Sequence, residues 1–290
     1  MAEEIGGITL RKEVVDSVIK GFAERSYKFK QAVSISTTNA WKESFFRETA
    51  TALSGQTGNA VKGIPRGASF PQATPEWTKV ASYVEKYGLE DFIHYEDIIS
   101  DDIDVQTRVL YKLSEGVVKG VDDEIWDKLT ESQSPSEIQE VAITAGATTG
   151  AWDTASASII DNLMNAKQLI GEYNYSTNNL MAFISEKDHR SIVNYLAGKG
   201  SQFPKIGEDI AENGRVGKLV GIQLVVSNSV TASYAMVCVP KICATWKQAV
   251  ALASDVKVEA FKGTRIRVCE MGTTQLTDPK AVVLISNTQE

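Results

Sequence analysis

Residues 101–131, DDIDVQTRVLYKLSEGVVKGVDDEIWDKLTE, carry an apolar residue at every fourth position. This spacing is typical of a helix, and no strand pattern produces it. We predict one helix over Asp101–Glu131, with Ser100 and two aspartates favouring its start and Ser132–Pro135 ending it. At about 1.5 Å per residue this helix is roughly 42 Å long, more than an ordinary compact domain needs to cross its core. The apolar positions are Val105, Val109, Leu113, Val117, Val121, Ile125 and Leu129.

A four-residue repeat winds around the helix, because each step advances the apolar stripe by about 40°. Different parts of the helix are therefore expected to pack against different elements. Gly116 and Gly120 each cost about 1 kcal/mol relative to alanine inside a helix. We expect another backbone to lie close to that turn. Two shorter helices broken near Gly120 are the alternative.

Length and charge limit the class of protein. The chain has 290 residues, 43% of them hydrophobic, a net charge of −7 and a pI near 5.1. An acidic protein without a clustered basic surface is not expected to bind nucleic acid independently of sequence. The charge is unevenly spread, since residues 85–104 hold eight carboxylates against one lysine and residues 42–79 hold five basic against three acidic residues.

The cysteines and the absence of long apolar runs bear on the compartment. Cys238, Cys243 and Cys269 lie in apolar, strand-like runs, so we expect buried reduced thiols and not a disulfide framework. Residues 1–7 contain two glutamates and no apolar core, so no signal peptide is expected. No apolar run approaches 18 residues, so no membrane span is expected.

A long hairpin is predicted before the helix. Residues 31–53 look extended, residues 54–75 are rich in glycine and proline, and strand-like sequence returns at residues 77–92. A glycine-rich tip of about twenty residues is unusual inside a compact domain. It is expected either to be disordered or to engage something else.

The other segments predict mixed helices and strands. Residues 8–30 show a short amphipathic pattern that predicts a helix. Its polar face is mixed but mainly basic, and we interpret it either as a solvated face or as a nucleic-acid contact. A helix from Asp153 or Thr154 to Ile170 and one with a Ser185–Asp188 capping box are expected. The order of elements is α+β and not a repeating βαβ series. The expected strands are 138–143, 180–184, 219–226, 234–239, 243–246, 256–261, 264–270 and 281–285.

No catalytic motif emerges. His94 and His189 are the two histidines, and neither lies in a G-x-S-x-G, an H-E-x-x-H or a phosphate-loop motif. Four aspartates could offer oxygens to calcium, but they lack the glycine and terminal glutamate of an EF-hand loop, and a helix start also favours negative charge. We expect no catalytic residue, no metal and no cofactor. The four aspartates are Asp97, Asp101, Asp102 and Asp104.

The order of these elements resembles the major capsid protein of tailed double-stranded DNA viruses, which has the Hong Kong 97-type capsid fold. Residues 217–228, GKLVGIQLVVSN, are similar to that family's G-x-L-x-G-x-P-V-V-x-S run, with Gln223 in place of the proline. The resemblance covers about residues 31–286. It implies an N-terminal arm (1–40), an E-loop (41–92), a peripheral domain (93–151 and 250–290) with a spine helix at 101–131, and a mixed α/β axial domain (152–249).

The resemblance implies a structural protein with no enzymatic activity. Its subunits would join as hexamers and pentamers into an icosahedral shell around double-stranded DNA, which they would contact weakly and non-specifically. Separate scaffolding, portal and decoration proteins are possible partners. The shell would assemble in the host cytoplasm and form the virion capsid of a bacteriophage or archaeal virus.

A head-to-tail ring joins two different surfaces of each subunit, which favours opposite charges on the two. We therefore expect the basic loop residues to face the acidic stretch of the next subunit. A crosslink from Lys62 to an asparagine, as in some members of that family, is a further possibility. The candidate contact residues are Arg47, Lys62, Arg66, Lys79, Glu90, Asp91, Glu96, Asp97, Asp101 and Asp102.

Two other functions fit parts of the sequence. An encapsulin nanocompartment would share the fold and package a cargo enzyme, but residues 8–30 match its cargo-binding helix weakly. A soluble enzyme with residues 54–75 as a mobile lid would need an acid, a base and a nucleophile, and no such set is evident.

Overall fold

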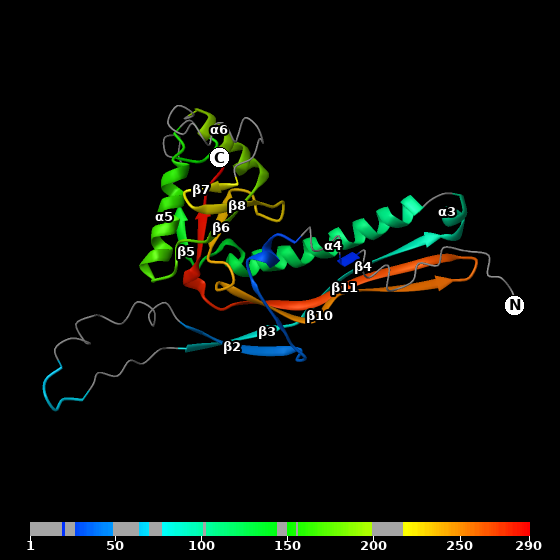
Figure 1. The fold of residues 1–290 in the computed structure, drawn as a ribbon, viewed down its shortest axis with the longest axis horizontal. Coiled ribbons are helices and arrows are strands. Elements are labelled where there is room, and N and C mark those ends of the chain that lie inside the picture. The colour runs from blue at the N-terminus through cyan, green and yellow to red at the C-terminus, as the bar shows by residue number, and fades with distance from the viewer. Residues whose placement is uncertain are drawn as a thin grey trace.

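The computed structural model describes residues 19–20, 27–48, 64–69, 77–100, 103–143, 150–154, 156–198 and 217–290. Figure 1 shows an elongated subunit in which a long helix connects two sheet-containing bodies and a hairpin leaves the junction. The elements are η1 Phe29–Gln31, β1 Ser34–Thr37, β2 Lys42–Glu48, β3 Trp77–Tyr83, β4 Glu85–His94, α3 Tyr95–Ser100, α4 Ile103–Leu129, η2 Glu131–Gln133, β5 Gln139–Ala142, α5 Ile159–Glu172, β6 Leu180–Ile184, α6 Glu186–Gly198, β7 Lys218–Leu219, β8 Ile222–Val226, β9 Tyr234–Cys238, β10 Ala244–Glu259, β11 Gly263–Leu276, η3 Pro279–Ala281 and β12 Val282–Ser286.

Helix α4 is a single unbroken helix, so the alternative of a break near Gly120 is wrong. It runs along β4 and β11, and its C-terminal turns reach the second body (Figure 1). The four-residue repeat is buried from Leu113 onward, where Val117, Val121, Ile125 and Leu129 are at most 2% exposed. Asp101 and Asp102, in the predicted first turn, lie outside the described residues.

The two glycines of α4 face strand β4. A Cβ atom at Gly116 would lie 2.3 Å from Leu89 Cδ1, and one at Gly120 would lie 3.5 Å from Tyr87 Cδ1. Side chains of the sheet lie against this turn, so the expectation of another backbone there is wrong. A helix packing on a sheet brings large strand side chains between the two backbones, so glycine makes room for them.

The first body contains a four-stranded sheet in the order β1-β10-β11-β4. Strands β10 and β11 form a long antiparallel hairpin with irregularities between Gln248 and Ala253, and β1 pairs in parallel with β10. Helix α4 covers one face of this sheet (Figure 1).

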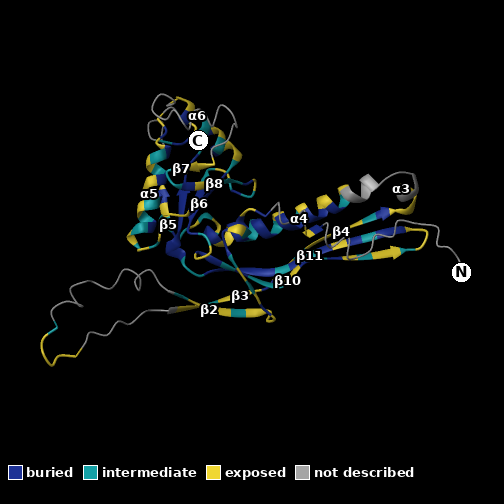
Figure 2. Ribbon diagram, in the orientation of Figure 1, coloured by how far each residue is buried: buried dark blue, intermediate teal, exposed yellow. Residues whose placement is uncertain are grey.

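The second body contains a six-stranded sheet in the order β5-β12-β9-β6-β8-β7. Strands β6 and β12 are buried at every position, which Figure 2 shows as dark blue arrows at the centre of this body. Helix α5 packs against β12 and β5. Continuous apolar runs such as VVLI in β12 are typical of strands with both faces covered.

Four strands do not follow the expected residue ranges. Strands β5 and β12 belong to the six-stranded sheet, although they fall within the ranges 93–151 and 250–290. Strand β4 belongs to the four-stranded sheet, although all but its last two residues fall within 41–92, and β10 continues across residue 249. Periodicity locates a strand but does not identify its partner, which explains these differences.

The two helices of the second body begin differently. Ser185 Oγ accepts the Asp188 backbone N–H at 3.1 Å and donates to Asp188 Oδ2 at 2.8 Å, which confirms the expected cap of α6. Helix α5 instead begins at Ile159, so the expected start at Asp153 or Thr154 is wrong. Thr154 Oγ1 donates to the Ala151 carbonyl at 2.7 Å and forms a turn there.

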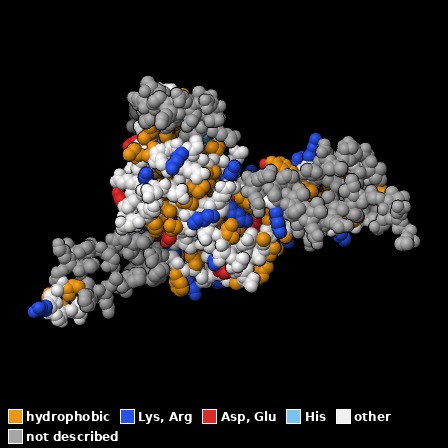
Figure 3. Space-filling model, viewed as in Figure 1, with side chains coloured by type: hydrophobic (Ala, Val, Ile, Leu, Met, Phe, Trp, Pro, Cys, Tyr) orange, Lys and Arg blue, Asp and Glu red, His pale blue; other side chains and the backbone are white. Residues whose placement is uncertain are grey.

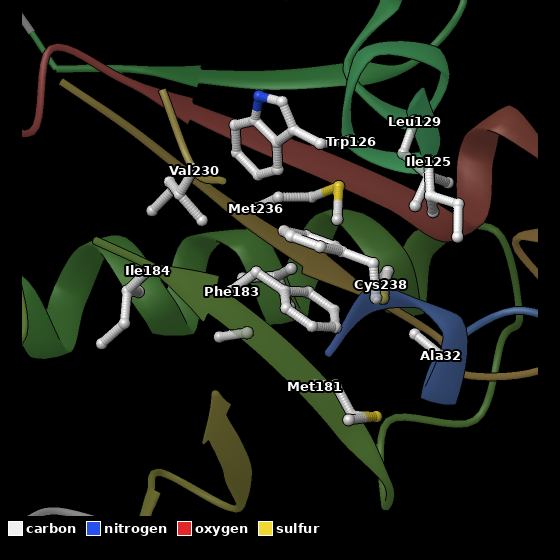
Figure 4. Packing of buried hydrophobic residues seen from close by; sticks show 14 of the residues in the cluster. Ala32, Ile125, Trp126, Leu129, Met181, Phe183, Ile184, Val230, Met236 and Cys238 are labelled. Atoms are coloured by element: carbon white, nitrogen blue, oxygen red, sulfur yellow. The ribbon is translucent and has the colours of Figure 1, made fainter. Parts of the chain in front are cut away.

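An aromatic joint holds the two bodies together. The Phe29 ring is fully buried, stacks on Phe183 of β6 with centroids 4.4 Å apart, and lies 5.5 Å from the Trp126 ring of α4. Figure 4 shows Trp126 and Phe183 with Met236 between the helix and the sheet.

Cys238 and Cys243 are buried free thiols as expected, whereas Cys269 is free but only half-buried.

Two carboxylates fix the segment that carries Phe29. Glu270 is fully buried and accepts hydrogen bonds from the Tyr27 hydroxyl, Lys30 Nζ, Trp246 Nε1 at 3.2 Å and Gln248 Nε2 at 3.1 Å. Asp122 of α4 accepts the Lys28 backbone N–H at 2.8 Å. The polar bonds therefore tie this segment to both the sheet and the helix.

Replacing Glu270 should destabilise the subunit strongly. Glu270→Ala leaves the partly buried Lys30 and several other donors without their acceptor, so we expect a loss of about 3–5 kcal/mol in the free energy of unfolding. The measurement is urea unfolding of the unassembled subunit followed by tryptophan fluorescence. Glu172→Ala, at an exposed position of α5, is the control and should change stability by at most about 0.5 kcal/mol. Equal stability of the two variants would contradict the buried network.

Asp122 should make stability depend on pH. Burial raises its pKa from 3.8 to about 6, against the lowering effect of the Lys28, Lys30 and Phe29 backbone N–H groups. The protonated Asp122 carboxyl therefore contributes to the free energy of unfolding. Its contribution is complete below pH 3.8 and is lost as pH rises through about 6. As pH rises from about 4 to about 7, the free energy of unfolding of Asp122→Asn should therefore increase relative to that of the wild type, by up to about 3 kcal/mol. A constant difference in urea unfolding across this range would show that Asp122 does not titrate in this way.

Candidate inter-subunit contact surface

The hairpin β2–β3 extends away from both bodies (Figure 1). Its strands are antiparallel and pair from Lys42 with Tyr83 to Glu48 with Trp77. The side chains of Trp41, Phe46 and Tyr83 are 60% exposed or more. An isolated two-stranded ribbon is marginally stable in water, and large exposed apolar side chains mark contact surfaces.

The base of the hairpin is anchored to its own chain. Lys247 Nζ lies 3.7 Å from Glu43 Oε2, and Gln275 Nε2 donates to Ser82 Oγ at 2.7 Å. These contacts join both hairpin strands to β10 and β11, so the hairpin leaves the body in a fixed direction.

Arg47 is a predicted contact residue that is already engaged within the chain. Its guanidinium lies 3.9 Å from Glu131 Oε1 and 3.5 Å from Glu137 Oε1. Glu131 Oε2 also accepts the backbone N–H groups of Ser136 at 2.6 Å and Glu137 at 3.0 Å. Although burial acts in the opposite direction, these two N–H groups, the Ser136 hydroxyl and Arg47 hold the pKa of Glu131 below its usual value.

A left-handed turn ends α4 beside Arg47. Glu131, Ser132 and Gln133 have φ angles of 48°, 52° and 65°. Such angles cost non-glycine residues roughly 1 kcal/mol or more each and persist where the surroundings impose them. Here Gln133 Nε2 and Trp126 Nε1 both donate to Thr231 Oγ1, at 2.8 Å and 3.0 Å. The turn thus links the hairpin base to the second body.

The predicted acidic residues lie along β4 and α3. Glu90 pairs with Arg267 at 2.7 Å and with Arg265 at 3.7 Å, so arginines of its own chain largely neutralise it. Asp91, Glu96 and Asp97 are exposed. Asp101 and Asp102 are outside the described residues.

The predicted basic loop residues are not brought to these acids within one chain. Arg66 lies in residues 64–69, far from both bodies in Figures 1 and 3, and its side chain is exposed. Lys79 on β3 is also exposed. Lys62, the suggested crosslink donor, lies outside the described residues. Whether these residues contact a neighbour stays a prediction.

A pocket that the sequence did not suggest lies between the hairpin base, the end of α4 and β11. Its volume is about 390 Å³, and Phe45, Val80, Tyr83 and Leu276 contribute apolar wall. Its charged lining consists of Glu85, Glu124, Asp127, Glu131, Arg47 and Lys128. Glu124 and Asp127 lie three residues apart on α4 and so share one helix face, and this spacing was the available signal.

The carboxylates of this pocket are incompletely neutralised. Burial first, then the nearby Glu85 and Asp127, raise the pKa of Glu124, despite Lys128 at 3.9 Å. Burial and Asp123 likewise raise the pKa of Asp127.

Among the described residues, no group of three or more His, Cys, Asp or Glu side chains is arranged to hold a metal ion. In the same part of the chain, no helix is long and apolar enough to cross a membrane.

Solved structures with the same arrangement of elements include three viral or virus-like particles. The capsid of cyanophage P-SCSP1u has a TM-score of 0.69 at 13% identity, over 99% of this chain and 92% of that chain. The virus-like particle of Pyrococcus furiosus has a TM-score of 0.65 at 11% identity, over 96% and 100%. Mycobacterium phage Che8 has a TM-score of 0.63 at 14% identity, over 100% and 98%. No curated protein matches the chain in sequence.

The phage capsid protein family model matches residues 77–285. This range runs from the first residue of β3 into β12. It includes α4, the strands of the six-stranded sheet, the four-stranded sheet except β1, and the second strand of the hairpin. The match covers well over half of the chain, and the solved capsids share its fold. The chain therefore belongs to the phage capsid protein family and is a viral major capsid protein with the Hong Kong 97-type fold.

Proposed function

We propose that this capsid protein assembles into hexamers and pentamers, which close into an icosahedral shell around double-stranded DNA. The observation that carries the proposal is the β2–β3 hairpin. It is fixed at its base, leaves the body, and exposes Trp41, Phe46 and Tyr83 to solvent in the single subunit. Because an exposed ribbon of this kind gains stability by packing, a neighbouring copy is the natural partner in a shell.

A head-to-tail ring accounts for the two ends of this contact. Each subunit would offer its hairpin to one neighbour and receive the hairpin of the other, and a rotation that closes generates a ring. The loop residues Arg66 and Lys79, together with Lys62, would face negative charge on the next subunit. The chain would act structurally, without enzymatic activity or a cofactor.

The remaining features of the proposal concern the virion. Residues 1–40 would form an arm, and α4 would be the spine of a peripheral domain beside an axial domain built on the six-stranded sheet. Separate scaffolding, portal and decoration proteins would assist assembly in the host cytoplasm. Contact with the packaged DNA would be weak and independent of sequence, in keeping with the net charge of −7.

The content of the particles separates this function from an encapsulin-like shell. Electron microscopy of particles isolated from infected or expressing cells, with nuclease treatment and mass spectrometry of the contents, is the measurement. Protected double-stranded DNA supports the viral capsid, whereas a single packaged enzyme supports the nanocompartment. Small oligomers at every concentration would contradict both.

Removing the loop should abolish assembly without unfolding the subunit. Glu48 and Trp77 are the last paired residues of the hairpin, so a two-residue Asn-Gly turn can replace residues 49–76. We expect the shortened chain to keep the unfolding midpoint of the unassembled wild type but to form no shells. Light scattering and electron microscopy check the shells, and circular dichroism checks the fold. Normal shells from the shortened chain would contradict the proposed role of the loop.

A further inference from the structure

The pocket between the hairpin base, the end of α4 and β11 holds excess negative charge. Four carboxylates line it, against the two cations Arg47 and Lys128. Arg47 is taken up by Glu131 and Glu137, and Lys128 is half exposed and reaches Glu124 only at 3.9 Å. Glu85, Glu124 and Asp127 therefore share the pocket with only partial compensation, from Lys128 and from the Tyr87 hydroxyl, which donates to Glu85 Oε2 at 3.2 Å.

A buried hydroxyl in the same pocket lacks a partner. Thr274 of β11 lines the pocket and is 3% exposed, and its Oγ1 has no hydrogen-bond partner among the described residues. Buried polar atoms are normally hydrogen-bonded, because leaving one unpaired costs about 1–3 kcal/mol. An incoming donor that reaches Thr274 would satisfy it.

The shape and chemistry of the pocket fit a guanidinium better than a metal ion. The described carboxylates are not grouped closely enough to ligate a metal. A guanidinium has five donors in a planar fork, so it can bond to separate carboxylates and a hydroxyl at once. Phe45 and Tyr83 supply ring surface in the lining, against which such a plane can stack.

We propose that this pocket receives the guanidinium of Arg66 from the hairpin of a second copy of the chain. The proposal rests on the proposed assembly and specifies one of its contacts. It also places the receiving carboxylates at Glu85, Glu124 and Asp127, and not at Glu90, which Arg265 and Arg267 already neutralise.

Arg66 is the hairpin cation best presented for this role. Arg47 is bound by its own chain, and Lys42 Nζ lies over the Tyr83 ring, 5.4 Å from its centroid. Arg66 instead occupies an exposed turn closed by the Ala68 N–H to Pro65 carbonyl bond at 3.1 Å, with Gly67 at φ 80°. Glycine with a positive φ at the third position is typical of a type II turn, and Arg66 occupies the exposed second position of this turn.

Charge exchange tests the contact directly. Full-length Arg66→Asp and Asp127→Arg should each raise the protein concentration for half-maximal shell assembly at least about tenfold, because each places like charges together. The double variant should recover most of the wild-type assembly. Glu115→Gln, an exposed carboxylate on the same helix outside this pocket, is the control and should assemble as the wild type does. Circular dichroism and thermal unfolding of the unassembled subunits confirm that every variant folds.

The outcomes separate this inference from the proposed function. Wild-type shells combined with normal assembly of Arg66→Asp would overturn the inference and leave the proposed function standing. The same holds if both single variants fail and the double variant shows no recovery. If the wild type forms no shells at all, the proposed function itself fails. A further outcome is that spermidine or free arginine stabilises the unassembled wild type but not Asp127→Asn, while Arg66→Asp assembles normally. That result would assign the pocket to a free organic cation and would also overturn the inference.

Discussion

The rest of the subunit depends on one helix being buried against two sheets at once. Along its length α4 packs on β4 and β11, and Leu89 fills the space left by Gly116. At its C-terminal end Trp126 turns toward the second body, where it contacts Phe29 and bonds to Thr231. An apolar stripe that winds by about 40° per step produces this change of partner without bending the helix. The relative position of the two bodies is therefore set by a rigid rod and not by a flexible linker.

The polar bonds at the joint add specificity to this apolar packing. Glu270 is fully buried and would be costly there without its donors, so the native position of Tyr27 and Lys30 is strongly favoured over any alternative. Asp122 acts on the same segment from the helix side. Because the segment continues into β1 and then β2, its anchoring also determines where the hairpin starts.

Local chemistry explains which features the sequence could predict. The long helix and the Ser185 cap depend on neighbouring residues in the chain. The structure has both, although the helix spans Ile103–Leu129 and Glu131, its predicted last residue, lies in the turn that follows. The partners of β4, β5 and β12 depend on contacts across the fold, which a periodic pattern does not encode. The candidate surface also depends on contacts across the fold. Glu90 forms ion pairs with Arg265 and Arg267, which are distant in sequence, and Glu85 and Asp127 line the same pocket only after folding. The left-handed turn at Glu131–Gln133 carries no glycine, so nothing in its composition indicated it.

The hairpin is the point at which the folding of one chain leaves burial incomplete. Its base is fixed by Arg47, Glu43 and Ser82, so it cannot fold back freely onto its own subunit to cover its exposed aromatic residues. Just inside that fixed base lies the acidic pocket, where the Thr274 hydroxyl has no hydrogen-bond partner among the described residues and the pKa values of Glu124 and Asp127 are raised, by burial first. In the proposed contact, the exposed Arg66 turn and the acidic pocket would complement each other between copies of the chain. This arrangement would favour the proposed shell, because the hairpin and the pocket would both become more stable when neighbours are present.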